Sequence, residues 1–183
     1  MSIYFEKPQK HPIDTSNWKM FRVGDLFEIE NGKASSSNNK PGSIALINAG
    51  GTNQGVLGKF DIEAPYVNKI TIVGQGDGAS GVAFYHDYPF NATSCVRVLT
   101  EKFEGLTKYN AAFLCAIFTK LFHESGKYNF SYGLSQSRLK SEQIPLPVDS
   151  NGNPDWAWMD KAARDIEERS ILIQAIKQNR KRE

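Results

Sequence analysis

The chain has 183 residues, 40% of them hydrophobic and 23% charged, so it has enough apolar side chains for a packed core and is not a disordered chain. Its 22 Lys and Arg nearly balance its 20 Asp and Glu, and a net charge of +2 argues against a protein that binds polyanions through bulk charge alone. The length suits one domain with an appended element. No apolar run reaches eighteen residues and the N-terminus lacks a signal-peptide pattern, so we expect a soluble, cytoplasmic protein.

The first half of the sequence predicts strands separated by polar loops. Residues 1–17 hold two prolines and few periodic apolar positions, which indicates an extended arm. Residues 18–22 then predict a short strand, and residues 23–27 a turn of helix. β-Branched and apolar runs predict the following strands: 44–47, 70–73, 82–85, 90–93 and 95–99.

The period of the apolar residues changes to that of a helix in the second half. Apolar side chains over residues 107–124 recur at the spacing of a core-facing helix, with Thr107 at its start and Gly126 at its end. After a polar and aromatic segment at residues 127–140, prolines favour an extended stretch at 144–148.

A long helix is expected from Pro154, at its first position, to about Lys181. Apolar residues seven apart on it form a short coiled-coil-like seam, and the rest of its surface is charged, so the helix projects and needs a partner. We therefore expect dimerisation through the following residues: Met159, Ile166, Ile173 and Ile176.

These patterns together predict a mixed α+β fold, in which a strand-rich domain precedes a long coiled-coil-like C-terminal helix. We divide the chain into an N-terminal arm at residues 1–17, a domain at 18–150 and a helix at 151–183.

Residues 76–81 match the G-x-G-x-x-G pattern of dinucleotide-binding loops. That interpretation requires a helix directly after the loop, and a strand follows instead. Two interpretations stay open: a glycine-rich β-hairpin loop, or glycines that let the backbone approach a ligand phosphate.

The sequence predicts no catalytic residue, metal site or cofactor site. It contains no Glu-x-Lys or Asp-x-Lys triplet of the kind a metal-dependent nuclease would use, and its three histidines are scattered. Residues 153–156 differ from the Asn-Pro-Pro-aromatic motif of adenine methyltransferases, because Asp155 stands at the third position and a helix follows.

The segment 127–140 interleaves cations, amides, hydroxyls and aromatic rings, a combination typical of nucleic-acid contacts. Arg138 and Gln136 are candidates for base edges, and Lys127 and Lys140 for phosphates. An alternative is a partly buried loop in which Arg138 pairs with an acidic neighbour.

Three further polar loops, 35–40, 48–55 and 74–81, are expected on the same side of the domain as segment 127–140, because each directly follows a predicted element. The predicted DNA contacts are the following: Ser36, Asn38, Lys40, Asn53, Gln54, Gln75, Ser80, Lys127, Tyr132, Ser135, Gln136, Arg138 and Lys140.

Several motifs, in this order, resemble a known family. They are Trp18-x-x-Phe21-x-Val23-Gly24-Asp25-Leu26-Phe27, the glycine loop 74–81, Phe90-Asn91-Ala92-Thr93, Tyr132-Gly133-x-x-x-x-Arg138-Leu139-Lys140, and Gly152-Asn153-Pro154-Asp155-Trp156. Over residues 18–180 the chain resembles the target-recognition domain of specificity subunits from type I restriction–modification systems and their BcgI-like relatives.

This resemblance implies a recognition domain that reads half of a bipartite site in double-stranded DNA. It also implies a long helix that pairs with another specificity subunit, or with a second copy, and docks the methyltransferase subunit. The chain would then catalyse nothing itself, and S-adenosylmethionine, ATP and Mg would act only in partner subunits. Family subunits usually carry two recognition domains, and this chain has room for one.

Two rival functions remain at this stage. A protein-interaction adaptor that uses the coiled-coil helix is favoured by the near-neutral charge. A small enzyme that binds a phosphate ligand at the glycine loop lacks acid and base groups.

Overall fold

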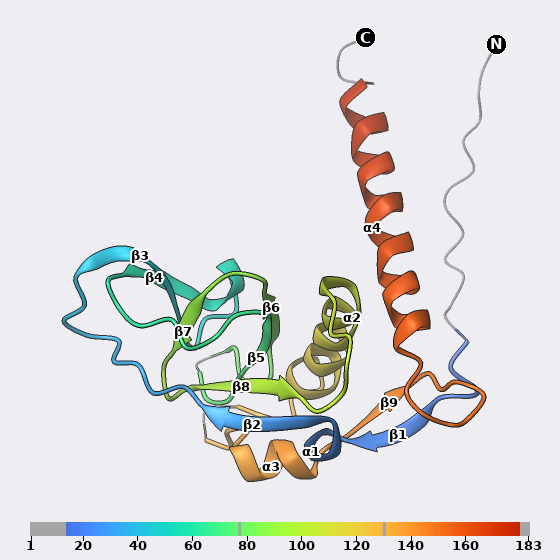
Figure 1. The fold of residues 1–183 in the computed structure, drawn as a ribbon, viewed down its shortest axis with the longest axis horizontal. Helices are drawn as coiled ribbons and strands as arrows, with labels where there is room; N and C mark the ends of the chain where they lie inside the picture. The colour runs from blue at the N-terminus through green and yellow to red at the C-terminus, as the bar shows by residue number, and fades with distance from the viewer. Residues whose placement is uncertain (1–13, 77, 130, 180–183) are drawn as a thin grey trace.

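The computed structural model describes residues 14–76, 78–129 and 131–179. On the C-terminal helix it describes side chains only up to Ile171 and that of Gln174. Most of the expected arm at residues 1–17 therefore lies outside the described residues. The described part is a mixed α+β domain from which one helix projects (Figure 1). The predicted fold class is confirmed.

The central layer is a four-stranded antiparallel sheet with strand order β2-β8-β5-β6. Its strands are β2 (Phe27–Asn31), β8 (Val96–Glu101), β5 (Lys69–Val73) and β6 (Ala83–His86). Helix α2 (Lys108–Phe118), which continues as a π-helical segment over Thr119–Glu124, packs on β5 and β6. The main core lies between them and contains Ile70, Ile72, Leu99 and Phe118.

A second sheet has the order β4-β3-β7 and consists of β4 (Val56–Phe60), β3 (Pro41–Ile47) and β7 (Phe90–Ala92). Strand β3 runs antiparallel to β4 and parallel to β7. Strand β4 is missing from the sequence prediction. The predicted strands at 44–47, 70–73, 82–85, 90–93 and 95–99 are all present, with bounds that differ by at most three residues.

Two pairs of short elements close the domain beneath the central sheet. Strand β1 (Lys19–Arg22) pairs with β9 (Gln143–Leu146), and the one-turn helix α1 (Val23–Leu26) packs against α3 (Gln136–Ser141). Phe27, expected at the end of the helical turn, instead begins β2, because its ring is fully buried in the core.

The predicted ends of α2 are confirmed. The Thr107 hydroxyl accepts from the Asn110 N–H, and the Asn110 side chain accepts from the Thr107 N–H, which together form a capping box. Gly126 follows the helix with φ of +71°.

Helix α4 (Trp156–Asn179) begins two residues later than expected. Pro154 forms a β-bridge with Val148, and the Asp155 carboxylate accepts from the Trp158 N–H at 2.9 Å. Asp155 thus caps the helix, because its side chain accepts a hydrogen bond from a backbone N–H of the first helical turn. No helix among residues 14–76, 78–129 and 131–179 is long and apolar enough to cross a membrane.

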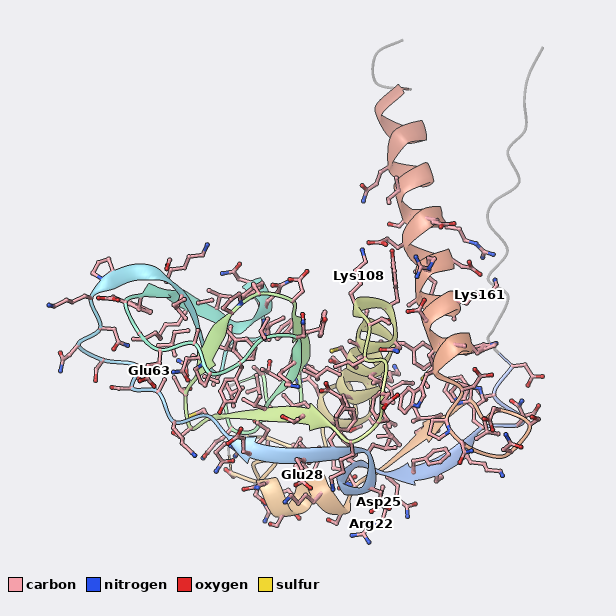
Figure 2. All side chains as sticks on the ribbon, viewed as in Figure 1. Arg22, Asp25, Glu28, Glu63, Lys108 and Lys161 are labelled. Carbon is pink, nitrogen blue, oxygen red and sulfur yellow. The ribbon has the colours of Figure 1, made fainter. Side chains whose placement is uncertain are left out.

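The base of α4 is held by the domain and its C-terminal part leads away from it (Figure 1). Trp156 stacks on Phe103 with 3.8 Å between ring centroids, and Met159 is fully buried. Figure 2 shows Lys108 at the end of α2 beside α4, where its ammonium lies 3.8 Å from the Glu167 carboxylate.

Candidate nucleic-acid interface

Three loops from distant parts of the sequence meet on one surface. At Gly76 a Cβ atom would lie 2.9 Å from the Ala49 carbonyl oxygen, so the glycine loop lies against loop 48–55. On the other side of the glycine loop, the Leu134 N–H donates to the Gly74 carbonyl over 2.7 Å. We call this the three-loop surface, consisting of residues 48–55, 74–76, 78–81, 127–129 and 131–134.

Loop 35–40 is not part of this surface, which corrects the expectation that all four segments lie together. Loop 35–40 leads into β3 and loop 48–55 leaves it, so the two lie at opposite ends of a seven-residue strand, about 20 Å apart. Figure 1 shows the chain between β2 and β3 running along the outer edge of the second sheet. Ser36, Asn38 and Lys40 are exposed there.

Loop 48–55 presents two exposed amide side chains from a constrained backbone. Asn53 and Gln54 have φ of +49° and +52°. The Asn48 N–H donates to the Gly55 carbonyl over 2.8 Å, and the Tyr88 hydroxyl donates to Oε1 of Gln54 over 3.1 Å. Both predicted contacts on this loop are exposed.

The glycine loop joins β5 to β6 as an antiparallel hairpin, so the hairpin interpretation is confirmed and no helix follows. Two of its glycines are required by close packing. A Cβ at Gly74 would lie 2.4 Å from the Arg97 guanidinium carbon, and one at Gly81, where φ is +88°, would lie 2.5 Å from the backbone of Phe122.

Within this loop the two predicted contacts differ. Gln75 is exposed on the three-loop surface. Ser80 is only 1% exposed, and its hydroxyl donates to the Gly76 carbonyl over 3.2 Å and accepts from the Gly76 N–H over 3.3 Å. The expectation that Ser80 contacts DNA is therefore corrected, because its hydroxyl is used to hold the hairpin together.

A cleft of about 370 Å³ opens between the glycine loop and segment 127–131. It is lined by Gly76, Gly78, Ala79, Ser80, His123, Tyr128, Asn129 and Ser131. Nδ1 of His123 donates to the Ser80 carbonyl over 3.1 Å. In the neutral ring Nε2 is then a hydrogen-bond acceptor. His123 was not expected on this surface, since only tertiary contacts bring it to the glycine loop. Asn129 and Ser131 lie within the predicted segment 127–140 but were not among the predicted DNA contacts.

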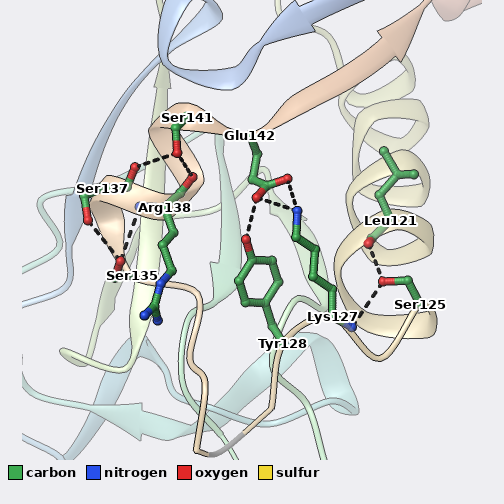
Figure 3. Close-up of polar contacts among 9 residues, drawn as sticks. All are labelled: Leu121, Ser125, Lys127, Tyr128, Ser135, Ser137, Arg138, Ser141 and Glu142. Carbon is green, nitrogen blue, oxygen red and sulfur yellow. Dashed lines mark hydrogen bonds and ion pairs between the residues drawn. The ribbon is translucent and has the colours of Figure 1, made fainter.

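Segment 127–140 begins with an ion pair (Figure 3). The Lys127 ammonium lies 2.7 Å from the Glu142 carboxylate, and the Tyr128 hydroxyl donates to the same carboxylate over 2.5 Å. Burial, and then the hydrogen bond to the Glu142 carboxylate, raise the pKa of Tyr128. Lys127, predicted to bind a phosphate, thus already has a carboxylate partner, although its side chain remains half exposed.

Arg138 has an aromatic partner in place of the acidic one considered above. Its guanidinium carbon lies 3.8 Å from the centroid of the Tyr132 ring, and Nη1 donates to the Gly133 carbonyl over 2.7 Å. Among the described residues no carboxylate lies within 4.0 Å of this guanidinium. Tyr132 is 49% exposed, so the pair forms the rim of the three-loop surface.

Of the remaining candidates, Ser135 caps α3, whereas Gln136 and Lys140 on this helix face the other way. Ser135 caps the helix by accepting from the Arg138 N–H over 3.3 Å, and Nε2 of Gln136 donates to the Ile29 carbonyl on β2. Lys140 lies 4.0 Å from Glu28, also on β2. Gln136 and Lys140 therefore lie against β2 and not on the three-loop surface, because α3 packs under the central sheet.

The described residues hold no group of three His, Cys, Asp or Glu side chains placed to bind a metal. His86 on β6 is fully buried, and burial lowers its pKa to about 4. It therefore carries no charge at neutral pH.

The predicted dimerisation seam is divided by the fold. Met159 is fully buried in the core of its own domain, so its expected place on an exposed seam is corrected: the first turns of α4 pack on α2. Ile166, two turns later, is 59% exposed and lines an apolar groove of about 800 Å³ between α2 and α4. The side chains of Ile173 and Ile176 lie outside those described.

Comparisons with known proteins agree with this architecture. The family model described as "Type I restriction modification DNA specificity domain" matches residues 15–178. The specificity subunit of the BcgI type II restriction enzyme from Heyndrickxia coagulans is 25% identical over 157 residues, which are 85% of this chain and 45% of that protein. A putative type I specificity subunit of Mycoplasma pneumoniae is 32% identical over 143 residues, 75% of this chain and 55% of that protein.

Solved structures show the same fold. A type I restriction–modification S subunit from M. genitalium superposes with a TM-score of 0.63 at 21% identity, over 91% of this chain and 41% of that one. The HsdS subunit of Thermoanaerobacter tengcongensis gives a TM-score of 0.58 at 12% identity, over 92% and 42%. The chain spans about half the length of the relatives it matches.

Proposed function

The chain belongs to the type I restriction-modification DNA specificity domain family, whose model matches residues 15–178, and from this premise we propose that it reads one half of a bipartite site in double-stranded DNA. It would direct a methyltransferase subunit, and any associated restriction subunit, to that site. Residues 18–150 would act as the recognition domain and residues 151–183 as the association helix.

The observation that carries this proposal is the meeting of three loops on one surface. That surface exposes side chains able to donate or accept hydrogen bonds: Asn53, Gln54, Gln75, Asn129, Ser131 and Tyr132. They stand on a rigid support, since the loops are joined to one another by the Gly74–Leu134 hydrogen bond and the Gly76–Ala49 contact. Base edges in the major groove are read by this kind of side chain, whereas phosphates are met by cations and backbone N–H groups.

One recognition domain reads one half-site, so reading the other half-site requires a second recognition domain. The exposed Ile166 and the apolar groove beside it support association through α4. A two-fold symmetric pair of domains would then face a target with matching symmetry.

Methyl transfer and cleavage would belong to partner subunits, together with S-adenosylmethionine, ATP and Mg. The surface described above contains amides, hydroxyls and aromatic rings in place of a nucleophile with its base. The chain's contribution is therefore binding and placement.

Selection from randomised duplexes, with the chain and its methyltransferase subunit combined, tests the proposal. We expect one enriched half-site, and a preference that Gln75→Ala weakens at a single base position while the melting temperature stays unchanged. Asn129→Ala should also weaken the preference but with a lower melting temperature, because the Asn129 side-chain oxygen accepts from the Tyr132 N–H over 2.9 Å. Asn38→Ala is the matched control, because it removes an exposed amide at the far end of β3.

A larger effect of Asn38→Ala than of either surface variant would move the reading surface to loop 35–40. Binding that ignores sequence and salt concentration would favour the adaptor function, because phosphate contacts make affinity fall steeply with ionic strength.

A further inference from the structure

A chain of side-chain hydrogen bonds leads from the buried sheet to the exposed loop 48–55. It begins at Thr71 on β5, whose hydroxyl lies 2.8 Å from Nε2 of His86. Nδ1 of His86 lies 3.0 Å from the Tyr88 hydroxyl, which donates to Oε1 of Gln54 over 3.1 Å. His86 also packs on Phe90 with 4.7 Å between ring centroids, so the inner end of the chain is fixed.

The direction of each hydrogen bond in this series follows from the bond between Tyr88 and Gln54. A phenol has one hydrogen, and Tyr88 gives it to Gln54. The Tyr88 oxygen therefore accepts from Nδ1 of His86, and Nε2 is left to accept from the Thr71 hydroxyl. Burial lowers the pKa of His86 to about 4, so the ring is neutral near pH 7, as this arrangement requires.

The backbone under Gln54 is held as firmly as its side chain. Asn53 and Gln54 both have φ in the left-handed region, which residues other than glycine seldom adopt. The Asn53 amide donates to the Val56 carbonyl over 3.3 Å, and the Asn48–Gly55 hydrogen bond closes the loop. Such backbone persists only where its surroundings hold it, and it concentrates at functional sites.

The amide of Gln54 is thereby oriented. Its oxygen faces Tyr88, which leaves the NH₂ group to face outward as a donor. A glutamine that reads adenine needs both groups, since it accepts from N6 and donates to N7. Guanine presents two acceptors, N7 and O6, at the same edge.

We propose that Tyr88 is a positioning residue that turns the Gln54 oxygen away from the target and presents the NH₂ group to it, so that this position of the target selects guanine over adenine. The inference rests on the proposed function, because it requires the three-loop surface to contact bases. It adds which group of the Gln54 amide faces the base, and it names Tyr88 as the residue that sets this orientation.

Base selection by four variants of the full chain, each with its methyltransferase subunit, tests the inference. Tyr88→Phe removes the hydroxyl, Gln54→Met removes the amide, and the double variant removes both. Tyr85→Phe is the matched control: Tyr85 also donates to an amide oxygen, that of Asn68, over 3.4 Å, but outside the three-loop surface. Randomised duplexes are the probe, and a melting temperature is measured for each variant.

We expect the native chain to prefer guanine over adenine at one position, and Tyr88→Phe to lower that preference about three- to tenfold. Gln54→Met should lower it further at the same position. The double variant should match Gln54→Met, because Tyr88 acts only through Gln54. Tyr85→Phe should leave the target unchanged.

Two results would overturn the inference alone. One is a Tyr88→Phe chain that keeps the full preference which Gln54→Met loses. The other is a Gln54→Met chain that weakens all sequences alike, as loss of a phosphate contact would. A native chain that is folded and bound to its methyltransferase subunit but enriches no sequence overturns the proposed function, and the inference with it.

Discussion

Lowering the pH from 8 to 5 is expected to destabilise the fold through the buried imidazole of His86. Burial lowers the pKa of this ring from 6.5 to about 4, against the opposing charge of Asp87. In the unfolded chain the ring regains its ordinary pKa, so between pH 6.5 and 4 the unfolded state binds more protons than the folded state. The stability is therefore complete above pH 6.5 and is lost as the pH falls through this window.

The size of the effect follows from the two pKa values. Between pH 8 and 5 the free energy of unfolding should fall by about 2 kcal/mol, and by about 3 kcal/mol once the folded ring is also protonated. This is a large share of the roughly 5–15 kcal/mol that stabilises a typical domain. Carboxylates with lowered pKa act in the same direction, but their effect appears mainly below pH 5.

Urea unfolding at pH 8 and pH 5 measures the loss, with His86→Gln as the comparison. The glutamine amide can accept from Thr71 and donate to Tyr88 but does not titrate, so the variant should lack the 2 kcal/mol decline. Equal pH dependence in the two proteins would show that His86 is not held neutral by the fold.

Three further expectations concern packing and association. Met159→Ala should lower the free energy of unfolding by about 2–5 kcal/mol in chemical denaturation, because it leaves a cavity in the core, whereas Ile166→Ala should change it by less than about 0.5 kcal/mol. Ile166→Glu should shift sedimentation toward monomers with the circular dichroism spectrum unchanged, and an unaltered oligomer would place the association elsewhere. Thr107→Ala should cost about 1 kcal/mol in thermal unfolding through loss of the α2 cap, while Gly81→Ala should cost more, since its Cβ would collide with the backbone of Phe122.

The regular elements follow from local pattern wherever burial is one-sided or complete. Residues 70–73 are apolar or β-branched and fully buried, and residues 107–124 keep one apolar face against the sheet, so both were predictable. Strand β4 was not, because Gly58 and Lys59 interrupt its alternation and its stability comes from pairing with β3.

The candidate site was predictable in its composition and less so in its geometry. Loops 48–55 and 74–81 were placed together correctly, but the prediction that loop 35–40 joins them was wrong, since it ignored which end of β3 each loop occupies. The Gln136 side chain points toward the central sheet, because its amide donates to the Ile29 carbonyl on β2. Likewise, seven-residue spacing predicted a seam on α4 but could not show that Met159 faces the domain.

The hydrogen bond that closes loop 48–55 gives this part of the protein an evolutionary and engineering consequence. Because Asn48 and Gly55 are already joined at 2.8 Å, the strands on either side do not depend on what lies between them. Doubling the length of such a loop adds only about 0.6 kcal/mol of closure entropy. Insertions and exchanges between residues 50 and 54, which leave the Gly76–Ala49 contact in place, are therefore a low-cost route to altered binding, whereas substitutions within β3 itself would disturb a buried sheet.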